Sequence, residues 1–417
     1  MSTDPLTGLW RGVRCRAILP QPRFKFLSRR NGSTLPRYTA HSYSACRTTF
    51  RLPVAFFYSF LRPERHNVLV TTLNTLSYLL VVLCAAPLTW YCTKLTRQYA
   101  MSSGMLDVPT GRSSHRLPTP RGAGLAIVVV SILGIVAGAV AGWLPPAYAW
   151  TVGLGGALVA FVGWMDDRRG LSPFVRLVAH ASASAWALWW LGGFRLLRME
   201  SSGWLMISVG MALSFLVITW AISSYNFMDG IDALAGAEAV WVGLIGGALA
   251  LRSGHHDIAF VSLLLAAASA GFLHWNLPPA KVFLGDVGSG FLGYAFVTLA
   301  LLSDREGALP AHGWLILLGV FVFDSTTTLL RRMIRGEAWN ATHRESAYQR
   351  AALRFARHAP VTIVVLLLNV ILSGLTIIGV IHPTRWVEIG AVAFFMLVAV
   401  YVAVDRFAPI ARATPST

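Results

Sequence analysis

Residues 226–236, NFMDGIDALAG, place an amide and two carboxylates within seven positions: Asn226, Asp229 and Asp232. The segment lies between two apolar stretches that are each long enough to enter a membrane. Carboxylates beside lipid are costly unless they face water, a charged partner or a metal ion. We therefore expect these three side chains to bind a ligand, with a helix-capping role for Asp232 as the alternative.

Four other stretches also combine charged side chains with glycine. They are DVPTGRSSHRLPTPRGAG (107–124), GWMDDRRGLSP (163–173), KVFLGDVGSGFLG (281–293) and RRMIRGEAWNATHRESAYQR (331–350). Asp166, Asp286 and Asn226 offer hard oxygen ligands, which suit Mg²⁺ bound together with substrate phosphates. The glycines in GDVGSG and RGAG allow backbone N–H groups to approach an anion closely.

Donors for phosphate oxygens occur in the same stretches. The candidates are Arg112, His115, Arg121, His343 and Arg344. Arginine binds phosphate with a bidentate fork. Carboxylates, a divalent metal and guanidinium groups together favour phosphoryl transfer, in which catalysis is mostly positioning and charge neutralisation.

Each motif also has a structural interpretation. The acidic pair at 166–167 could simply precede a helix that starts near Ser172, and Asp286 could form a tight turn. The basic loop around His343 could bind lipid headgroups. Asp324 lies inside an apolar segment, where it either lines a cavity or bonds within the bundle, and both interpretations stay open.

The composition predicts an all-α, polytopic integral membrane protein. Of 417 residues, 55% are hydrophobic and 13% charged, about half the roughly 25% charge of a soluble domain. Apolar runs of the length needed for a span, about 20 residues, recur along the chain. We predict eleven spans: 68–92, 122–143, 147–164, 174–193, 203–224, 234–251, 257–274, 288–303, 312–330, 361–381 and 386–405. The 288–303 segment is the weakest of them.

The charge pattern argues for membrane orientation and against nucleic-acid binding. The net charge is +17, but the basic residues cluster at the ends of spans. Loops on one side carry fifteen Lys and Arg residues and loops on the other carry five. The first set is expected to face the cytoplasm, and all five polar stretches belong to it. The four cysteines form no CxxC pair, so their spacing does not indicate a metal site or a disulfide.

The N-terminal stretch departs from this pattern. Residues 1–66 carry twelve Lys and Arg and only two acidic residues, yet the orientation places them outside. We interpret them as a basic, disordered tail or as the product of a start codon assigned too early, and a membrane segment at 52–61 stays open as an alternative. The membrane-embedded domain is expected at 67–405, followed by a short cytoplasmic tail at 406–417.

Taken in order, the five motifs resemble those of the polyprenyl-phosphate N-acetylhexosamine-1-phosphate transferases. This superfamily includes the phospho-MurNAc-pentapeptide transferases and the enzymes that initiate O-antigen chains. The resemblance covers about residues 70–405. It implies a bacterial inner-membrane enzyme that moves an N-acetylamino-sugar-1-phosphate from a UDP-sugar to undecaprenyl phosphate. UMP is released, Mg²⁺ is required with Mn²⁺ as an alternative, and the active site faces the cytoplasm.

The resemblance also implies roles for individual residues. Asp166 and Asp167 match the family's acidic pair, in which the first carboxylate touches the metal or deprotonates the lipid phosphate. Asp286 matches a metal aspartate, with Asn226 and Asp166 assisting. The other assignments are catalysis for His343 together with the acidic pair, and substrate binding for Arg112, His115, Arg121, Asn226, Asp229, Asp232 and Arg344.

Three departures from the family pattern bear on the substrate. Ala233 stands where the DGxDGLA motif has glycine, and Ala123 interrupts a glycine pair after Pro-Arg. The last motif reads HRESAYQR, not the multi-histidine run of the pentapeptide transferases. It is more similar to the HRSHAYQR type of O-antigen initiators that use 6-deoxy-amino sugars, with Ser346 in place of the second histidine. This favours a UDP-linked N-acetylated amino sugar, such as FucNAc, QuiNAc or GlcNAc, over the pentapeptide substrate.

Two other functional classes are weaker. An ion-coupled transporter also uses intramembrane carboxylates and glycine-broken helices, but it predicts acidic residues near the midplane and related halves. No internal repeat is visible in the sequence. A non-catalytic scaffold would not explain why so many side chains that could bind a metal ion or phosphate occur in these stretches. A homodimer is left open.

Overall fold

The computed structural model describes residues 68–109, 118–194, 204–337 and 345–409, with the side chains of 68–75 excepted. These ranges confirm the all-α prediction, with a single two-stranded hairpin as the β structure that they contain. The elements in chain order are α2 (Val68–Ser102), β1 (Leu106–Asp107), β2 (Thr119–Pro120), α3 (Leu125–Val140), α4 (Pro146–Tyr148), π-helix η1 (Ala149–Leu154), α5 (Gly155–Arg169), α6 (Pro173–Leu191), α7 (Trp204–Phe227), α8 (Leu234–Arg252), α9 (His256–Asn276), α10 (Gly285–Glu306), α11 (Ala311–Leu317), α12 (Gly319–Ile334), α13 (Ala347–Phe355), α14 (Ala359–Ile381), η3 (Pro383–Arg385) and α15 (Trp386–Phe407).

The helices confirm a multi-pass membrane protein. Within the described ranges, eight helices are long and apolar enough to cross a membrane, or nine when α11 and α12 count as one bent span. Each of the eleven predicted spans overlaps a helix, but α3 is shorter, with 16 residues, and α6 does not belong to the eight. The predicted total of eleven spans is therefore not confirmed. α15 ends at Phe407, inside the stretch predicted as a tail.

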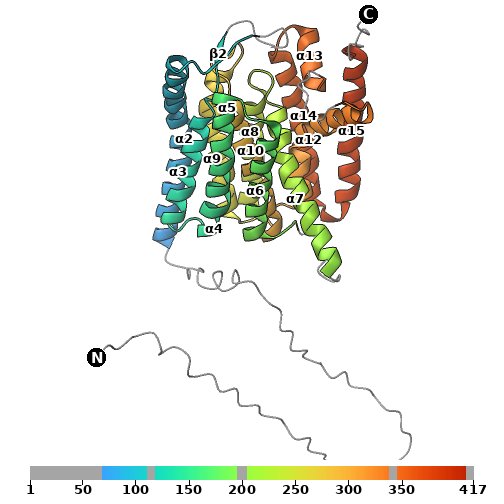
Figure 1. Ribbon diagram of the computed structural model, residues 1–417. Coiled ribbons are helices and arrows are strands. Elements are labelled where there is room, and N and C mark those ends of the chain that lie inside the picture. The colour runs from blue at the N-terminus through green and yellow to red at the C-terminus, as the bar shows by residue number, and fades with distance from the viewer. Residues whose placement is uncertain (1–67, 110–117, 195–203, 338–344, 410–417) are drawn as a thin grey trace, which may run out of the picture. The chain divides into compact units, whose positions relative to one another are not determined.

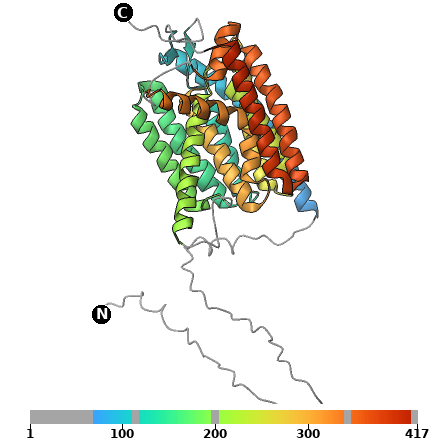
Figure 2. The ribbon, with the colours of Figure 1, turned by 90° about the vertical axis from the view of Figure 1, so that its right-hand side faces the viewer.

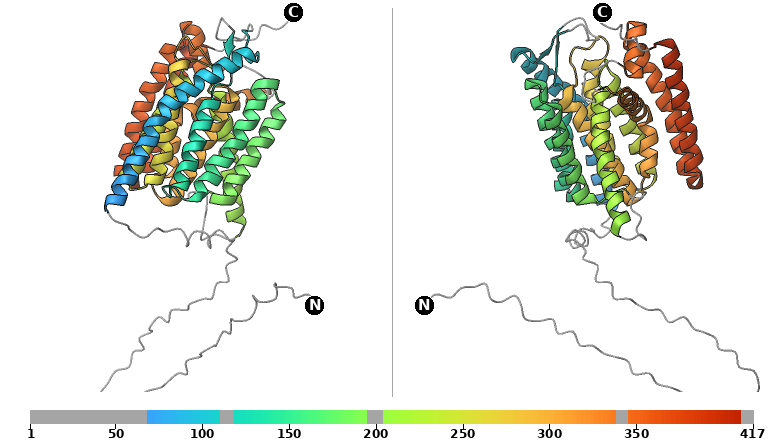
Figure 3. Two further views of the ribbon diagram at one scale, coloured as in Figure 1. Left: turned by 90° about the vertical axis from the view of Figure 1, so that its left-hand side faces the viewer. Right: turned by 45° about the vertical axis from the view of Figure 1, so that its right-hand side comes forward.

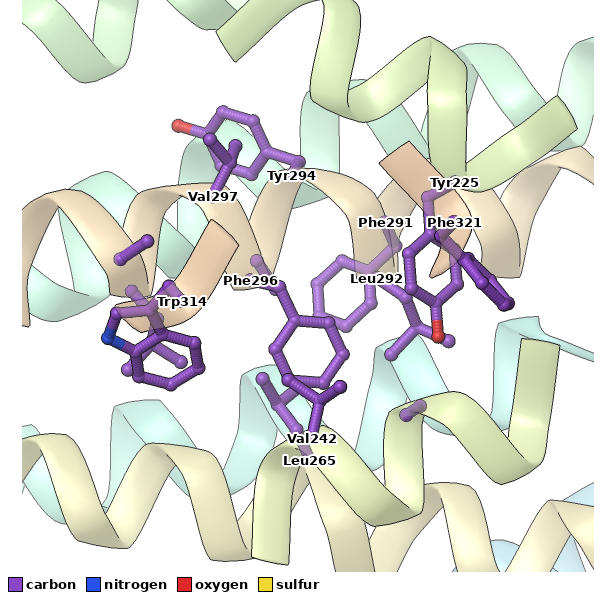
Figure 4. Close-up of a cluster of buried hydrophobic side chains, with 14 of the residues drawn as sticks. Tyr225, Val242, Leu265, Phe291, Leu292, Tyr294, Phe296, Val297, Trp314 and Phe321 are labelled. Atoms are coloured by element: carbon purple, nitrogen blue, oxygen red, sulfur yellow. The ribbon is translucent and has the colours of Figure 1, made fainter. Parts of the chain in front are cut away.

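The core is centred on α10, the weakest of the predicted spans. Almost the whole length of α10 is buried, because α5, α7, α9 and α3 surround it. Figure 4 shows aromatic side chains of α10, including Phe291 and Phe296, beside Tyr225 of α7. A helix that touches protein on all sides needs no lipid-facing apolar stripe, and small residues let its neighbours approach closely.

The two ends of the bundle differ in their elements. The β1–β2 hairpin and α13 lie at one end, and α4 lies at the other (Figure 1). α2 and α15 lie on opposite sides of the bundle, and α14 runs beside α15 (Figures 2 and 3). Because α5 runs away from α4 and ends at Arg169, it delivers the acidic pair to the end that carries the hairpin.

One span is sharply bent. α11 and α12 meet at an angle of 80° around Leu318. The bend carries α12 past the end of α7, where Ser325 and Ser224 share a hydrogen bond. It also places Asp324 against the beginning of α13. Of the two interpretations that the sequence left open for Asp324, the structure therefore shows hydrogen bonding within the bundle.

Candidate active site

The acidic pair occupies the last turn of α5. α5 ends because Gly170 adopts φ 67°, a left-handed conformation that suits glycine. The next helix starts as the sequence suggested, with Ser172 accepting a hydrogen bond from the Val175 N–H and proline in the first turn. Neither carboxylate caps that helix. Asp166 Oδ1 instead accepts the Leu171 N–H at 2.5 Å.

Asp167 caps a different helix, α10. Its two carboxylate oxygens accept the N–H groups of Asp286 and Val287, at 3.0 and 3.1 Å. These N–H groups lie in the first turn of α10, where no intrahelical partner exists. The carboxylate fits there because Gly285, at φ 77°, has no side chain to collide with it. The Asp167 side chain is fully buried.

Asp286 stands at the centre of an ionic cluster. Arg121, just after β2, donates from Nη2 to Asp286 Oδ1 at 2.9 Å, and its Nε lies 2.6 Å from Asp167 Oδ1. The Asn226 amide also donates to Asp286 Oδ1, at 3.0 Å, and to Ser289. Although burial lowers the pKa of Arg121, the carboxylates of Asp286 and Asp167 raise it above its ordinary value. Arg121 is therefore a fixed positive charge that joins two acidic residues.

Arg176 completes the cluster and was not found by sequence reasoning. It lies one turn into α6, and its Nη1 is 3.2 Å from Asp166 Oδ2 and 3.7 Å from Asp286 Oδ2. Asp166 Oδ2 is buried and accepts no hydrogen bond of normal geometry among the described residues. The signal that could have found Arg176 is its position: it is the one arginine of a mostly apolar helix that starts beside the acidic pair.

Asp229 borders the same cluster. Burial raises its pKa well above the ordinary value, and the negative charge of Asp286 raises it further, while Arg121 lowers it. Four carboxylates thus face two guanidinium groups. The cluster therefore contains more acidic than basic side chains.

Asp232 lies in other surroundings, although sequence reasoning grouped it with Asp229. Its carboxylate accepts the Ala280 N–H at 3.1 Å and lies 3.1 Å from Nδ1 of His358, the N-cap residue of α14. It does not act as the side-chain cap of α8 either, because the residue at that cap is Ala233. Ala233 adopts φ 65°, a conformation that favours the glycine found there in the family motif.

The structure brings together residues from four of the five polar stretches. Arg121, the acidic pair, Asn226, Asp229 and Asp286 gather at one end of the bundle, whereas Asp232 bonds elsewhere. Four predicted residues lie outside the described ranges: Arg112, His115, His343 and Arg344. Within those ranges, no three acidic, histidine or cysteine side chains form a metal-binding group by themselves.

Comparison with known proteins identifies a family and several relatives that this chain resembles. The family model of glycosyl transferase family 4 matches residues 149–304, which include α5, α6, α7 and all but the last two residues of α10. A probable undecaprenyl-phosphate N-acetylglucosaminyl 1-phosphate transferase of Bacillus subtilis is 29% identical over 296 residues, which cover 67% of this chain and 79% of the relative. A decaprenyl-phosphate N-acetylglucosaminephosphotransferase of Mycobacterium tuberculosis is 32% identical over 265 residues, which cover 56% of this chain and 62% of the relative.

A third relative is a phospho-N-acetylmuramoyl-pentapeptide-transferase of a Synechococcus species, 32% identical over 243 residues, which cover 55% of this chain and 68% of the relative. The fold and the cluster define a polytopic membrane protein with an ionic site at one end of its helical bundle. The chain belongs to glycosyl transferase family 4. This confirms the superfamily that the motifs resemble.

Proposed function

We propose that this protein transfers an N-acetylamino-sugar-1-phosphate from a UDP-sugar to undecaprenyl phosphate. The products are an undecaprenyl-diphospho-sugar and UMP. The observation that carries the proposal is the convergence of Arg121, Asp166, Arg176 and Asp286 from four separate segments at one end of a membrane protein. Such a site suits a reaction between two phosphates, one of which is anchored in lipid.

The reaction that we propose is a single displacement at phosphorus. An oxygen of the lipid phosphate attacks the β-phosphorus of the UDP-sugar. The bond between this phosphorus and the oxygen that bridges it to the α-phosphate breaks, and UMP leaves with the electron pair. We favour direct attack over a covalent aspartyl intermediate, because the acceptor is already an anion and needs little activation.

Charge neutralisation is the main task of the protein in this reaction. Donor and acceptor are both anionic, so they repel each other until cations lie between them. Arg121 and Arg176 are about one third exposed, so their guanidinium groups can reach substrate phosphates while they stay paired with carboxylates. Asp166 is the candidate to accept a residual proton from the lipid phosphate.

The donor set of the cluster fits Mg²⁺. Two carboxylates of different helices, Asp166 and Asp286, converge beside Asn226, in a cluster whose acidic side chains outnumber its basic ones. Mg²⁺ takes one or two carboxylates and fills its remaining positions with water and substrate phosphates. A bound ion would supply stabilisation of the charge that develops on the leaving UMP. Mn²⁺, with similar ligand preferences, is the expected substitute.

The location of the carboxylates supports an enzyme over an ion-coupled carrier. They lie at the last turn of α5 and the first turn of α10, whereas a carrier places its ionisable residues near the midplane. The loops richest in Lys and Arg lie at this end, which supports a site that opens to the cytoplasm of a bacterial inner membrane. The similarity of the last motif to the HRSHAYQR type supports a role in O-antigen or related envelope glycan synthesis.

A substrate panel tests the proposal. The purified protein is mixed with undecaprenyl phosphate, Mg²⁺ and UDP-linked FucNAc, QuiNAc or GlcNAc, and UMP release is followed. We expect release to require lipid and metal together, and to stop on addition of EDTA. The sugar that reacts fastest identifies the donor. If the folded protein releases no UMP from any sugar of the panel, the proposed reaction is contradicted.

Arg176 gives a prediction that sequence motifs alone would not have made. Arg176→Met should lower kcat/KM by about 10- to 100-fold, the value of one or two hydrogen bonds to a charged group. Steady-state UMP release measures this. Arg168→Lys is the matched control, since Arg168 is exposed and lies over the Trp164 ring outside the cluster. Equal activity of the two variants would remove Arg176 from the site.

A further inference from the structure

The beginning of α13 has an unusual support. Its N-cap residue, Ser346, makes no side-chain capping bond, and the Ser346 hydroxyl is buried without a hydrogen-bond partner among the described residues. The cap comes instead from α12. Asp324 accepts the Ala347 N–H on Oδ1 at 2.8 Å and the Tyr348 N–H on Oδ2 at 3.0 Å. These N–H groups of the first turn have no intrahelical partner.

Burial, a hydrogen bond and the bend before α12 hold the Asp324 carboxylate in this position. The side chain is buried, 5% exposed, and Thr328, one turn along α12, donates to Oδ1 at 3.1 Å. A carboxylate at a helix N-terminus is stabilised by the partial positive charge of that end. The 80° bend between α11 and α12 brings Asp324 there. Neither the ionic cluster nor the proposed reaction uses this carboxylate directly.

The same turn of α13 contacts the segment that carries Asp229. The Tyr348 hydroxyl donates to the Phe227 carbonyl at 3.0 Å and accepts from the Gly230 backbone. Tyr348 therefore binds the backbone on both sides of Asp229. A Cβ at residue 230 would collide with the Tyr348 hydroxyl, so the glycine lets this hydroxyl approach the backbone closely. Asn226, which holds Asp286, directly precedes this segment.

We propose that Asp324 is a positioning residue. By capping α13 it fixes Tyr348, and Tyr348 fixes the 227–230 backbone that presents Asn226 and Asp229 to the ionic cluster. Asp324 touches no substrate in this arrangement and acts through α13. The effect on catalysis rests on the proposed function, whereas the mechanical coupling from α12 to residues 227–230 does not.

Hydrogen–deuterium exchange tests the coupling without any activity. In Asp324→Ala, peptides covering residues 345–350 should exchange about 10- to 100-fold faster at the Ala347 and Tyr348 amides, because charge-assisted bonds of this kind are lost. Peptides covering 227–233 should also exchange faster. Asp324→Asn keeps the shape of the side chain and one acceptor oxygen, so its exchange rates should lie between those of the wild type and of Asp324→Ala. This variant stays informative if the alanine variant fails to fold. Unchanged exchange at 347–348, or a change confined to those two amides, would overturn the proposal.

A double-variant cycle tests the effect on activity. Asp324→Asn and Tyr348→Phe should each lower kcat/KM for the UDP-sugar by about tenfold. The double variant should be little worse than either one, since both act on the same support. Thr376→Val is the control, because the buried Thr376 hydroxyl bonds to the Leu372 carbonyl of its own helix α14. Fully additive losses would overturn the proposal. A wild type without activity would contradict the proposed function instead, and the exchange result would then decide the coupling alone.

Discussion

Asp286→Asn is expected to lower kcat by about 10²–10³-fold or more, the range seen when a preorganised charge-stabilising group is removed. Asp286 is the residue that the cluster shares: Arg121, Asn226 and Arg176 all lie against its carboxylate. Asparagine has nearly the same shape but no charge. It would remove the proposed metal ligand and leave both guanidinium groups with one carboxylate fewer.

The control for this variant lies on the same helix. Asp304, near the other end of α10, is buried and accepts the Ala311 N–H at 3.0 Å. Asp304→Asn removes a charge of similar burial about five turns away, so it reports the cost to the fold alone. Steady-state UMP release and thermal stability in detergent are measured for both variants. Near-normal turnover of Asp286→Asn would refute its proposed role.

The two members of the acidic pair should respond in opposite ways. Asp166→Asn is expected to lower kcat by about 10²-fold or more with little loss of stability, because Asp166 Oδ2 faces Arg176 and Asp286. Asp167→Asn is expected to destabilise the protein by about 1–3 kcal/mol, the usual cost of leaving a buried donor without its acceptor. Its oxygens hold the first turn of α10 and Arg121, and an amide group cannot accept all of these bonds.

Thermal unfolding in detergent and single-turnover kinetics separate the two effects. A lower melting temperature for Asp167→Asn, with activity recovered in proportion to the folded fraction at low temperature, would fit a capping role. A stable Asp167→Asn protein that is inactive would assign the chemistry to Asp167 instead. That result would contradict the division of roles between the neighbouring carboxylates.

The fold was predictable because a chain in a membrane must satisfy its own backbone hydrogen bonds, and a long apolar segment does so as a helix. Apolar runs of sufficient length therefore located a helix in each predicted span. The prediction was weakest for 288–303, since α10 is covered by protein and its sequence, with glycine, serine and tyrosine, reflects packing contacts more than contact with lipid. The bend at Leu318 was not predicted, since no proline marks it.

The site was only partly predictable. Acidic and glycine motifs at span ends indicated Asp166, Asp167, Asn226, Asp229 and Asp286, because charged groups are rare there and conspicuous. Sequence could not show that Asp167 caps α10 from another helix, or that Asp232 turns toward His358. Such partners lie more than a hundred residues apart, and the direction of each side chain depends on the packing of whole helices.

Transfer of the β-phosphate is the central claim, and an isotope label tests it most directly. The donor identified by the panel is labelled with ³²P at the β-phosphate and mixed with undecaprenyl phosphate, with or without Mg²⁺, and the lipid and aqueous phases are separated. We predict that the label enters the lipid only when metal and lipid phosphate are both present, in amounts equal to the UMP released, and that Asp286→Asn slows this transfer by about 10²–10³-fold, as expected for its kcat. Label that leaves as UDP, or as free phosphate, while the sugar alone reaches the lipid would contradict the account.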